Sequence, residues 1–459
     1  GENTEGSTAR ITVSLAAPQT KALLGEALQA YRMKPLDLIL AATARAIREW
    51  AGGRRLWIHV EGHGRTATDD GLDLSRTVGW FTQLQPVLLE LPDTFEPADF
   101  LPAVKTALRD SAHHADVFAL LRYGVGAQGG RETLSHFPTP PVGLNYLGRW
   151  DAMGDDSWPV QLEAEWPGPL HSPEALRPHE LDITALVRNG QLEMAFEFST
   201  NLHTRETIER LAQSCSQILA KLTDHCLSPD AGAFVAADID LVDMSPEQFA
   251  TVGATLQQMG GPRAVEDVYP LTPVQEGMLF HVLLKPDSGI YLVQLTATLE
   301  GNIDPALFQK AWELLIARHP ILRTAFLWQD LERPLQVVHR AAPLSFVFHD
   351  WRAMDDGQQR TALEEFLGED RDQGFNLTIP PLTRVALFQA APNRYTMVWS
   401  CHHILLDGWS LALVMREITT LYEVLAAGAP IPPSTARPYR DFIAWRLHHA
   451  DEARESAYW

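Results

Sequence analysis

Two adjacent histidines, His402 and His403, end an apolar run in the stretch TMVWSCHHILLDGWS, the second strand of a hairpin predicted for residues 381–408. Successive side chains of a strand point to opposite faces, so both histidines cannot face one reactant while the strand continues. We therefore expect one histidine to pack and the other to point outward at the strand end. Histidine is the natural general base near neutral pH, where such a base supplies roughly 10²–10⁴-fold in rate.

Asp407 and Gly408 follow the two histidines across a predicted turn. Gly408 permits a bend that other residues resist, and Asp407 either orients a histidine or pairs with an arginine and holds the loop. Structural and metal-binding interpretations of the histidine pair compete with catalysis. Zinc is disfavoured because no other His or Cys cluster supplies the remaining ligands. A serine triad is disfavoured because no serine lies in a nucleophile-elbow pattern.

Strand and helix patterns are mixed throughout residues 1–227 and 267–459, which indicates two α/β parts. Residues 228–266 between them are acidic, weakly patterned, and punctuated by alanine, glycine and proline. We predict a linker there, with one short helix after Ser245-Pro246.

The composition excludes several classes of partner. The 459-residue chain carries 37 basic and 58 acidic side chains, a net charge of −21, which disfavours nucleic acid and an anionic membrane surface. Three cysteines without metal-like spacing favour a reducing, cytoplasmic setting. No apolar run reaches the roughly 20 residues that span a bilayer, so no transmembrane helix is expected.

The stretch HHILLDGWS resembles the HHxxxDG signature of the condensation domains of nonribosomal peptide synthetases. YPLTPVQEGMLFH (269–281) and RHPILRTAF (318–326) resemble the first and second motifs of the same family, in the family's order. The resemblance implies that residues 267–459 form the N-terminal lobe of a condensation domain. Such domains have two chloramphenicol-acetyltransferase-like lobes, mixed sheets with flanking helices, that face each other across a tunnel.

The first part of the chain resembles the C-terminal lobe of a related family, the epimerization domains. The matching motifs are PLDLILAATARA (35–46), EGHGR (61–65), RTVGWFTQLQPVLLEL (76–91), LLRYGVG (120–126) and GLNYLGRWD (143–151). Thr66 departs from the family pattern, which has a glutamate there. The resemblance implies an epimerization lobe at residues 1–227.

The chain opens at Gly1 without a methionine and stops at Trp459 inside a helical pattern, so we expect both ends to be cuts. The resemblance then implies a window from the back half of an epimerization domain to the front half of the next condensation domain. That condensation domain is expected to be of the D-to-L type, which accepts a D-configured donor.

In the condensation lobe, the resemblance makes His403 the catalytic histidine, which deprotonates or positions the acceptor amine as it attacks the donor thioester. His402 is expected to be a packed support. Asp407 is expected to hold the loop through an ion pair, for example with an arginine of the missing lobe, and Gly408 to keep the tunnel floor open. Arg323 has two interpretations: a contribution to the site or to carrier contact, or an ordinary surface arginine.

In the epimerization lobe, Glu61 is the predicted acid–base group, because inverting an α-carbon needs one group to remove a proton and another to return it. Burial there would raise the pKa of Glu61. The alternative is a surface glutamate in a loop. His63 is a helper or, as we favour, a turn-packing residue. Asn145 and Tyr146 are expected to line the same cleft, with Tyr146 alternatively a core aromatic.

The implied substrates are aminoacyl or peptidyl thioesters on the phosphopantetheine arms of upstream and downstream carrier domains, with no cofactor or metal bound directly. The complementary lobes would be further partners in the same polypeptide. Two alternatives are a catalytically inactive segment that docks carrier proteins, and a permuted hybrid in which the two lobes pair and place Glu61 opposite His403.

Overall fold

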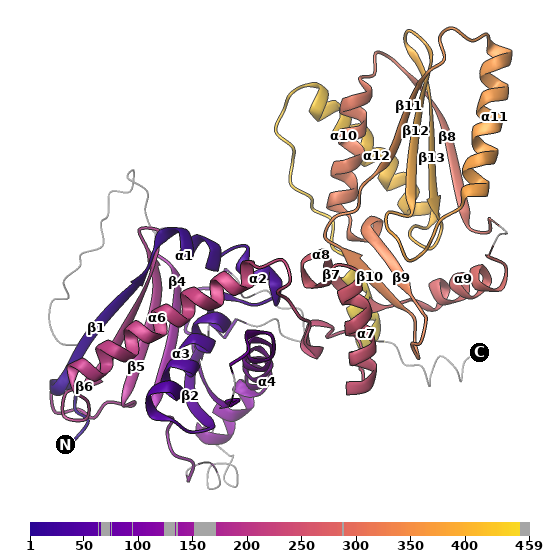
Figure 1. The fold of residues 1–459 in the computed structure, drawn as a ribbon. Coiled ribbons are helices and arrows are strands. Elements are labelled where there is room, and N and C mark those ends of the chain that lie inside the picture. The colour runs from indigo at the N-terminus through magenta and orange to yellow at the C-terminus, as the bar shows by residue number, and fades with distance from the viewer. Residues whose placement is uncertain are drawn as a thin grey trace. The chain divides into compact units, whose positions relative to one another are not determined.

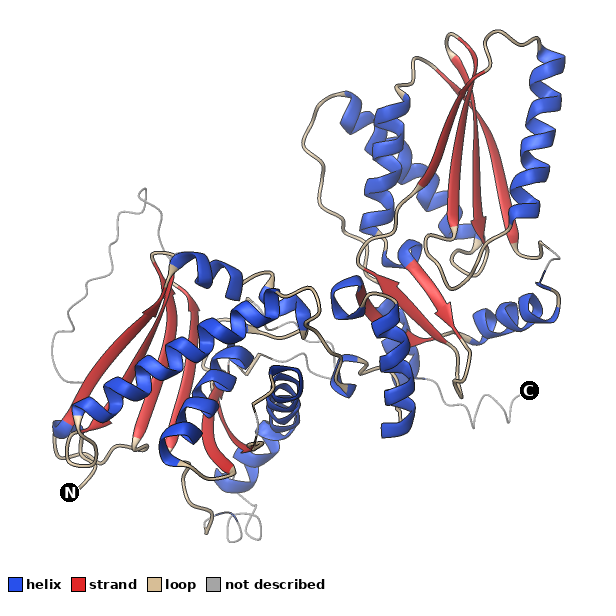
Figure 2. Ribbon diagram, in the orientation of Figure 1, coloured by secondary structure: helices blue, strands red, loops and turns tan. Residues whose placement is uncertain are grey.

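The computed structural model describes residues 1–62, 64–65, 74, 76–93, 95–123, 134, 136–150, 171–286 and 289–449. The chain divides into two compact units, Gly1–Ala237 and Asp238–Trp459. Each unit is built on a mixed sheet with flanking helices, coloured red and blue in Figure 2, which confirms the predicted fold class.

Unit 1 contains a six-stranded sheet in the order β1-β6-β5-β4-β2-β3. Its strands are β1 (Thr8–Leu15), β2 (Arg55–Gly62), β3 (Gln83–Glu90), β4 (Val142–Arg149), β5 (Leu181–Arg188) and β6 (Gln191–Ser199). The central pairs β2–β4 and β4–β5 are parallel, and the outer pairs are antiparallel. The sheet therefore places the ends of β2 and β4 on the same side, next to each other.

The helices of unit 1 gather on one face of this sheet (Figure 1). They are α1 (Ala17–Leu23), α2 (Ala27–Ala30), α3 (Pro35–Ala51), α4 (Pro97–Tyr123) and α6 (Arg205–Leu227). Along β1, Ile11 and Leu15 are buried toward the core, whereas Arg10, Thr12 and Ser14 are exposed. This period-two pattern is expected of a sheet that packs helices on one face only.

Unit 2 contains two sheets. The antiparallel sheet β7-β10-β9 consists of β7 (Val265–Pro270), β9 (Thr324–Leu327) and β10 (Leu335–His339). The mixed sheet β11-β12-β13-β8 consists of β8 (Leu292–Glu300), β11 (Ser345–Asp350), β12 (Thr383–Ala391) and β13 (Arg394–His402). The antiparallel pair β12–β13 confirms the predicted hairpin that ends at the histidines.

Helices cover both faces of the mixed sheet (Figure 1). The helices of unit 2 are α7 (Pro246–Gln258), α8 (Gly261–Ala264), α9 (Pro273–Leu284), α10 (Pro305–Arg318), α11 (Asp356–Gln373), α12 (Gly408–Ala426) and α13 (Tyr439–His449). Val398 and Phe388 pack toward α11, whereas Trp399 and Met397 pack in the cluster that contains α10 and α12. Strand β13 is therefore buried on both faces.

From Asp238 onward, the segment predicted as a linker belongs to unit 2. The predicted short helix is confirmed by α7, whose first turn is closed by a capping box between Ser245 and Gln248. Strand β7 begins at Val265, inside the same segment. Asp240 accepts hydrogen bonds from Arg440 at 2.6 Å to both carboxylate oxygens, so this stretch is tied to α13.

Helix α3 is anchored by Asp37, whose side chain is fully buried. The Asp37 carboxylate accepts the backbone N–H of Lys34 at 2.7 Å, which satisfies a donor at the helix start. It also forms a two-pronged ion pair with Arg109 of α4, at 2.9 and 3.2 Å. One carboxylate thus caps α3 and fastens α4 to it.

We expect Asp37→Ala to destabilise the chain by about 3–5 kcal/mol, because it leaves Arg109 and the helix start without their partner. The control is Glu49→Ala on the same helix, which removes the exposed pair with Arg45 and is expected to cost at most about 0.5 kcal/mol. Equilibrium urea unfolding of the whole chain measures both. Equal costs for the two variants would contradict the anchoring role of Asp37.

Candidate functional site

His402 is the last residue of β13 and is packed in the interior, with 4% of its surface exposed. Its ring Nδ1 accepts the backbone N–H of Ile404 at 3.2 Å. Burial, and secondarily the neighbouring His403, lowers the pKa of His402 to about 4. His402 is therefore a neutral, packed side chain, as expected for one member of the pair.

His403 lies just beyond the strand and is half-buried. Its backbone N–H donates to the carbonyl of Tyr291 at 2.7 Å, and its Nδ1 lies 2.5 Å from the carbonyl oxygen of Leu406. A carbonyl can only accept, so Nδ1 carries the hydrogen. The neutral ring then keeps its lone pair on Nε2, which is the atom able to take a proton from a reactant.

Asp407 is the N-cap of α12 and accepts the backbone N–H of Ser410 at 2.8 Å. Hydrogen bonds from the side chain of Ser410 and then from its backbone amide are the main reasons that the pKa of Asp407 is lowered. Within the described residues, its hydrogen-bond partner is Ser410 and not an arginine or a histidine ring. The contacts of Asp407 thus support a loop-holding role, achieved by helix capping.

Two expectations for this unit are corrected. Gly408 has no positive φ and begins α12, so its backbone conformation is open to any residue, and the prediction of a bend that other residues resist is wrong. Apart from its chain neighbours and the backbone of its own helix, no described atom lies within 4 Å of the position a Cβ would take at Gly408, so space is free there.

The interpretation of Arg323 as a surface arginine is also wrong, because only 4% of it is exposed. Its guanidinium pairs with Glu266 at 2.7 Å, donates to the carbonyl of Ile316 at 3.1 Å and contacts the carbonyl of His339. None of these partners belongs to the loop that carries His403. Arg323 therefore ties β7 and β10 to the end of α10.

Glu61 stands near the end of β2, half-buried, and forms a side-chain hydrogen bond with Asn145. Parallel strands β2 and β4 pair His59 with Gly143, so the next residues on the same face are Glu61 and Asn145. Burial raises the pKa of Glu61, and the hydrogen bond from Asn145 opposes part of that rise. A half-buried carboxylate with a raised pKa is suited to acid–base chemistry.

The structure separates Tyr146 from this pair. Tyr146 packs against the hydrophobic core of unit 1, and burial raises the pKa of its hydroxyl. Successive residues on β4 point to opposite faces, so Tyr146 does not share the position of Asn145. The core-aromatic interpretation of Tyr146 is the one confirmed. His63 lies outside the described residues.

A chain of polar side chains that the sequence did not reveal lies on the same face as Glu61. His59 Nδ1 lies 2.9 Å from His179 Nε2, and His179 Nδ1 lies 2.7 Å from the carboxylate of Asp182. Arg177 donates to the other oxygen of that carboxylate at 2.7 Å. Since a carboxylate only accepts, His179 holds its hydrogen on Nδ1 and accepts from His59.

Gly143 makes this chain possible. A Cβ at position 143 would lie 2.7 Å from His179 Nδ1 and 2.8 Å from Asp182 Oδ1, closer than real Cβ contacts. The side chains of His179 and Asp182 therefore cross over β4 where it has no side chain of its own. This row of polar side chains joins β5 to β2 two residues before Glu61. Alternation along β2 places His59 on the same face as Glu61, and it is the signal in the sequence that could have found His59.

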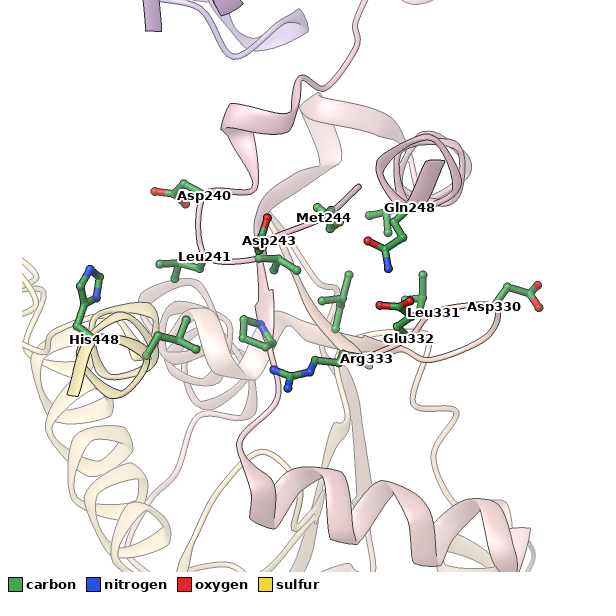
Figure 3. Close-up of a pocket in the computed structure, with 15 residues that line it drawn as sticks. Asp240, Leu241, Asp243, Met244, Gln248, Asp330, Leu331, Glu332, Arg333 and His448 are labelled. Atoms are coloured by element: carbon green, nitrogen blue, oxygen red, sulfur yellow. The ribbon is translucent and has the colours of Figure 1, made fainter. Parts of the chain in front are cut away.

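A cavity of about 540 Å³ lies elsewhere in unit 2 (Figure 3). Asp240, Asp243, Gln248, Glu332 and Arg333 are among the side chains that line it. None of the predicted site residues lines this cavity. Among the described residues, no group of three or more His, Cys, Asp or Glu side chains could hold a metal ion, and no helix is long and apolar enough to cross a membrane.

We expect the stability of unit 1 to fall as the pH falls from 6.5 toward 4. Burial, then His179 and Arg122, lowers the pKa of His59 from 6.5 to about 4. In that window the unfolded chain binds a proton that the folded chain excludes, which removes up to about 3 kcal/mol. The protection factors of β2 and β5 in hydrogen–deuterium exchange, which correct for the slower intrinsic exchange at lower pH, should therefore fall.

His59→Asn removes this titration and should flatten the pH dependence of the protection factors in β2. His114→Asn, at an exposed position of α4, is the matched control and should leave the dependence unchanged. An unchanged slope in His59→Asn would contradict the assignment of the pH dependence to His59.

Comparison with known proteins identifies the family. The condensation-domain family model matches residues 2–238 and 265–459. One component of the linear gramicidin synthase of Brevibacillus parabrevis is 36% identical over 458 residues, which cover 100% of this chain and 6% of that protein. Bacitracin synthase 1 of Bacillus licheniformis is 30% identical over 459 residues, which cover 98% of this chain and 8% of that protein.

Among solved structures, the epimerization domain from the third module of tyrocidine synthetase B is 28% identical, with a TM-score of 0.45 over 50% of each chain. The present chain spans less than a tenth of the length of the linear gramicidin synthase proteins that it matches. Because the family model matches nearly the whole sequence, the chain belongs to the condensation-domain family of the nonribosomal peptide synthetases.

Proposed function

We propose that the chain joins the C-terminal lobe of an epimerization domain, residues 1–227, to the N-terminal lobe of a condensation domain, residues 267–459. Residues 228–266 form the connection between the two lobes. The geometry of His403 carries this proposal, because its ring is held through Nδ1 and offers Nε2 as a base directly after the strand. Each lobe contributes half of a site, and complementary lobes of the same polypeptide contribute the other halves.

In the condensation reaction, the amine of an aminoacyl thioester attacks the carbonyl carbon of the donor thioester. A carbon–nitrogen bond forms, the carbon–sulfur bond breaks, and the donor carrier's thiol leaves. His403 takes the proton from the attacking nitrogen or holds the amine in place. Both reactants arrive tethered to carrier domains, so positioning alone supplies a large share of the rate. His402 is neutral and packed in the interior at the end of β13, where it supports the loop that carries His403.

In the epimerization reaction, Glu61 removes or returns the proton on the α-carbon of a carrier-bound thioester. Loss of this proton from one face and its return on the other converts the L to the D configuration. The second acid–base group is a histidine of the complementary lobe. This role is supported by the raised pKa of Glu61 and its hydrogen bond to Asn145.

The partners in both reactions are peptidyl carrier domains that present thioesters on phosphopantetheine. We propose that the reactions of the two lobes need no cofactor beyond the phosphopantetheine arms of the carrier domains. Because the epimerized product becomes the donor of the next step, we propose that the condensation domain is of the D-to-L type. The competing proposals, an inactive docking segment and a hybrid of the two lobes, predict different results in the experiment below.

In the synthetase that contains this chain, His403→Ala should lower peptide-bond formation by about 100-fold or more, while α-proton exchange of the upstream thioester continues. Glu61→Gln should lower that exchange by a similar factor and leave condensation of a chemically loaded D-configured donor intact. Mass spectrometry measures deuterium uptake at the α-carbon and dipeptide formed on the carrier.

The controls for these variants are His449→Ala and Glu90→Gln, which change exposed residues of the same units. Both should behave as the unaltered protein does. No effect of either catalytic variant would favour the inactive docking segment. Loss of both reactions in each variant would favour a hybrid site shared by Glu61 and His403.

Asn145→Ala should move the acidic limb of the epimerization pH–rate profile to higher pH. The Asn145 hydrogen bond stabilises the charged carboxylate of Glu61, so its loss raises the pKa further. Activity should then fall below the unaltered level at low pH and recover at high pH. Asn201→Ala, at an exposed site of unit 1, is the control, and an unmoved limb in Asn145→Ala would count against Glu61 as the titrating base.

A further inference from the structure

Tyr291, immediately before β8, has an unusual backbone conformation. Its φ is +65°, in the left-handed region that bulky side chains rarely adopt. A residue persists in this region only when the surrounding contacts hold it there, and such residues concentrate at functional sites. The contacts of Tyr291 therefore indicate which part of the structure depends on this conformation.

Two hydrogen bonds and two ring contacts fix Tyr291. Its carbonyl accepts the backbone N–H of His403 at 2.7 Å, and its hydroxyl lies 2.7 Å from Nδ1 of His281. The Tyr291 ring stacks on the His281 ring, with centroids 6.2 Å apart and planes 9° apart. It also approaches the buried ring of His402, with centroids 6.3 Å apart. Tyr291 thus connects α9, through His281, with the loop that follows β13.

The orientation of the His403 ring depends on this connection. His403 is held at two points, its backbone N–H by Tyr291 and its Nδ1–H by Leu406. In the antiparallel register of β13 and β8, His402 pairs with Leu292, so His403 and Tyr291 are the next pair and their hydrogen bond extends the ladder beyond both strands. If Tyr291 relaxed, the backbone hydrogen bond would weaken and the ring would lose one of its two constraints.

We propose that Tyr291 and His281 are positioning residues that fix the orientation of His403. The hydrogen bond and stacking between Tyr291 and His281 hold Tyr291 in its left-handed conformation, and its carbonyl holds His403. The consequence for catalysis rests on the proposed condensation function, whereas the effect on the His403 ring does not.

The first test observes the ring directly. The chain is labelled with ¹⁵N-histidine, and the ring nitrogens are observed by NMR, with His403→Ala assigning the His403 signals. The unaltered chain should show His403 with its hydrogen on Nδ1. In Tyr291→Phe, which keeps the ring and loses the hydroxyl, the signals should move toward a mixture of the two tautomers.

The matched control is Tyr422→Phe. The Tyr422 hydroxyl also accepts a hydrogen bond, from the backbone N–H of Asp304 at 2.9 Å, at the start of α10. Loss of the Tyr422 hydroxyl also removes one hydrogen bond, but that hydrogen bond does not involve the loop that carries His403. Tyr422→Phe should leave the His403 signals unchanged, and equal behaviour of the two phenylalanine variants would overturn the proposal.

The second test measures peptide-bond formation in the synthetase that contains the chain. Tyr291→Phe should lower kcat by about five-fold, the effect of one hydrogen bond, with little change in KM. His281→Leu should have the same effect, and the double variant should be no worse than either single one, because both act through one interaction.

Additive losses in the double variant would contradict a shared role for the two residues. The proposed function and the positioning proposal fail in distinguishable ways. If His403→Ala condensed normally while Tyr291→Phe still shifted the His403 signals, the positioning would stand and the catalytic role of His403 would fail. If His403→Ala were inactive and Tyr291→Phe changed neither signals nor kcat, only the positioning would fail.

Discussion

The burial of β13 on both faces is the constraint on which the surroundings of His403 depend. Val398 packs toward α11, and Trp399 packs against Trp312 of α10 with ring centroids 5.2 Å apart. A strand covered on both sides has no solvent-facing position, so its last residue, His402, must be neutral and packed. The first side chain free of this requirement is the next one. We therefore propose His403 as the residue of this loop that meets a reactant, and its backbone N–H and ring Nδ1–H are held by the carbonyls of Tyr291 and Leu406.

Unit 1 meets a different constraint, because its described helices all pack on one face of its sheet. Its other face carries polar side chains, and these satisfy one another across strands. The chain from His59 through His179 and Asp182 to Arg177 passes over Gly143, where β4 offers no side chain. Glu61 follows His59 by two positions on this face, and its half-buried carboxylate is partly shielded from water.

Sequence reasoning succeeded where the signal was local. Period-two and helical patterns predicted the β12–β13 hairpin and the helix after Ser245, and strand alternation predicted one packed and one outward histidine. It failed where partners are distant in sequence. His179 lies 120 positions from His59, and the burial of Arg323 depends on Glu266, which belongs to another strand. Neither pairing leaves a pattern in a single stretch of sequence.

The two proposed acid–base groups are prepared by different physical means, and the difference suits their reactions. The C–H group of an α-carbon is less acidic than the N–H group of an attacking amine. Removing the proton from carbon therefore needs a stronger base than removing it from nitrogen. Burial provides this at Glu61 by raising the pKa of its carboxyl, and the hydrogen bond from Asn145 opposes part of that rise. Peptide-bond formation asks mainly for orientation, because the nitrogen becomes acidic as it attacks. Fixing the ring of His403 through Nδ1 supplies that orientation without any need for a stronger base.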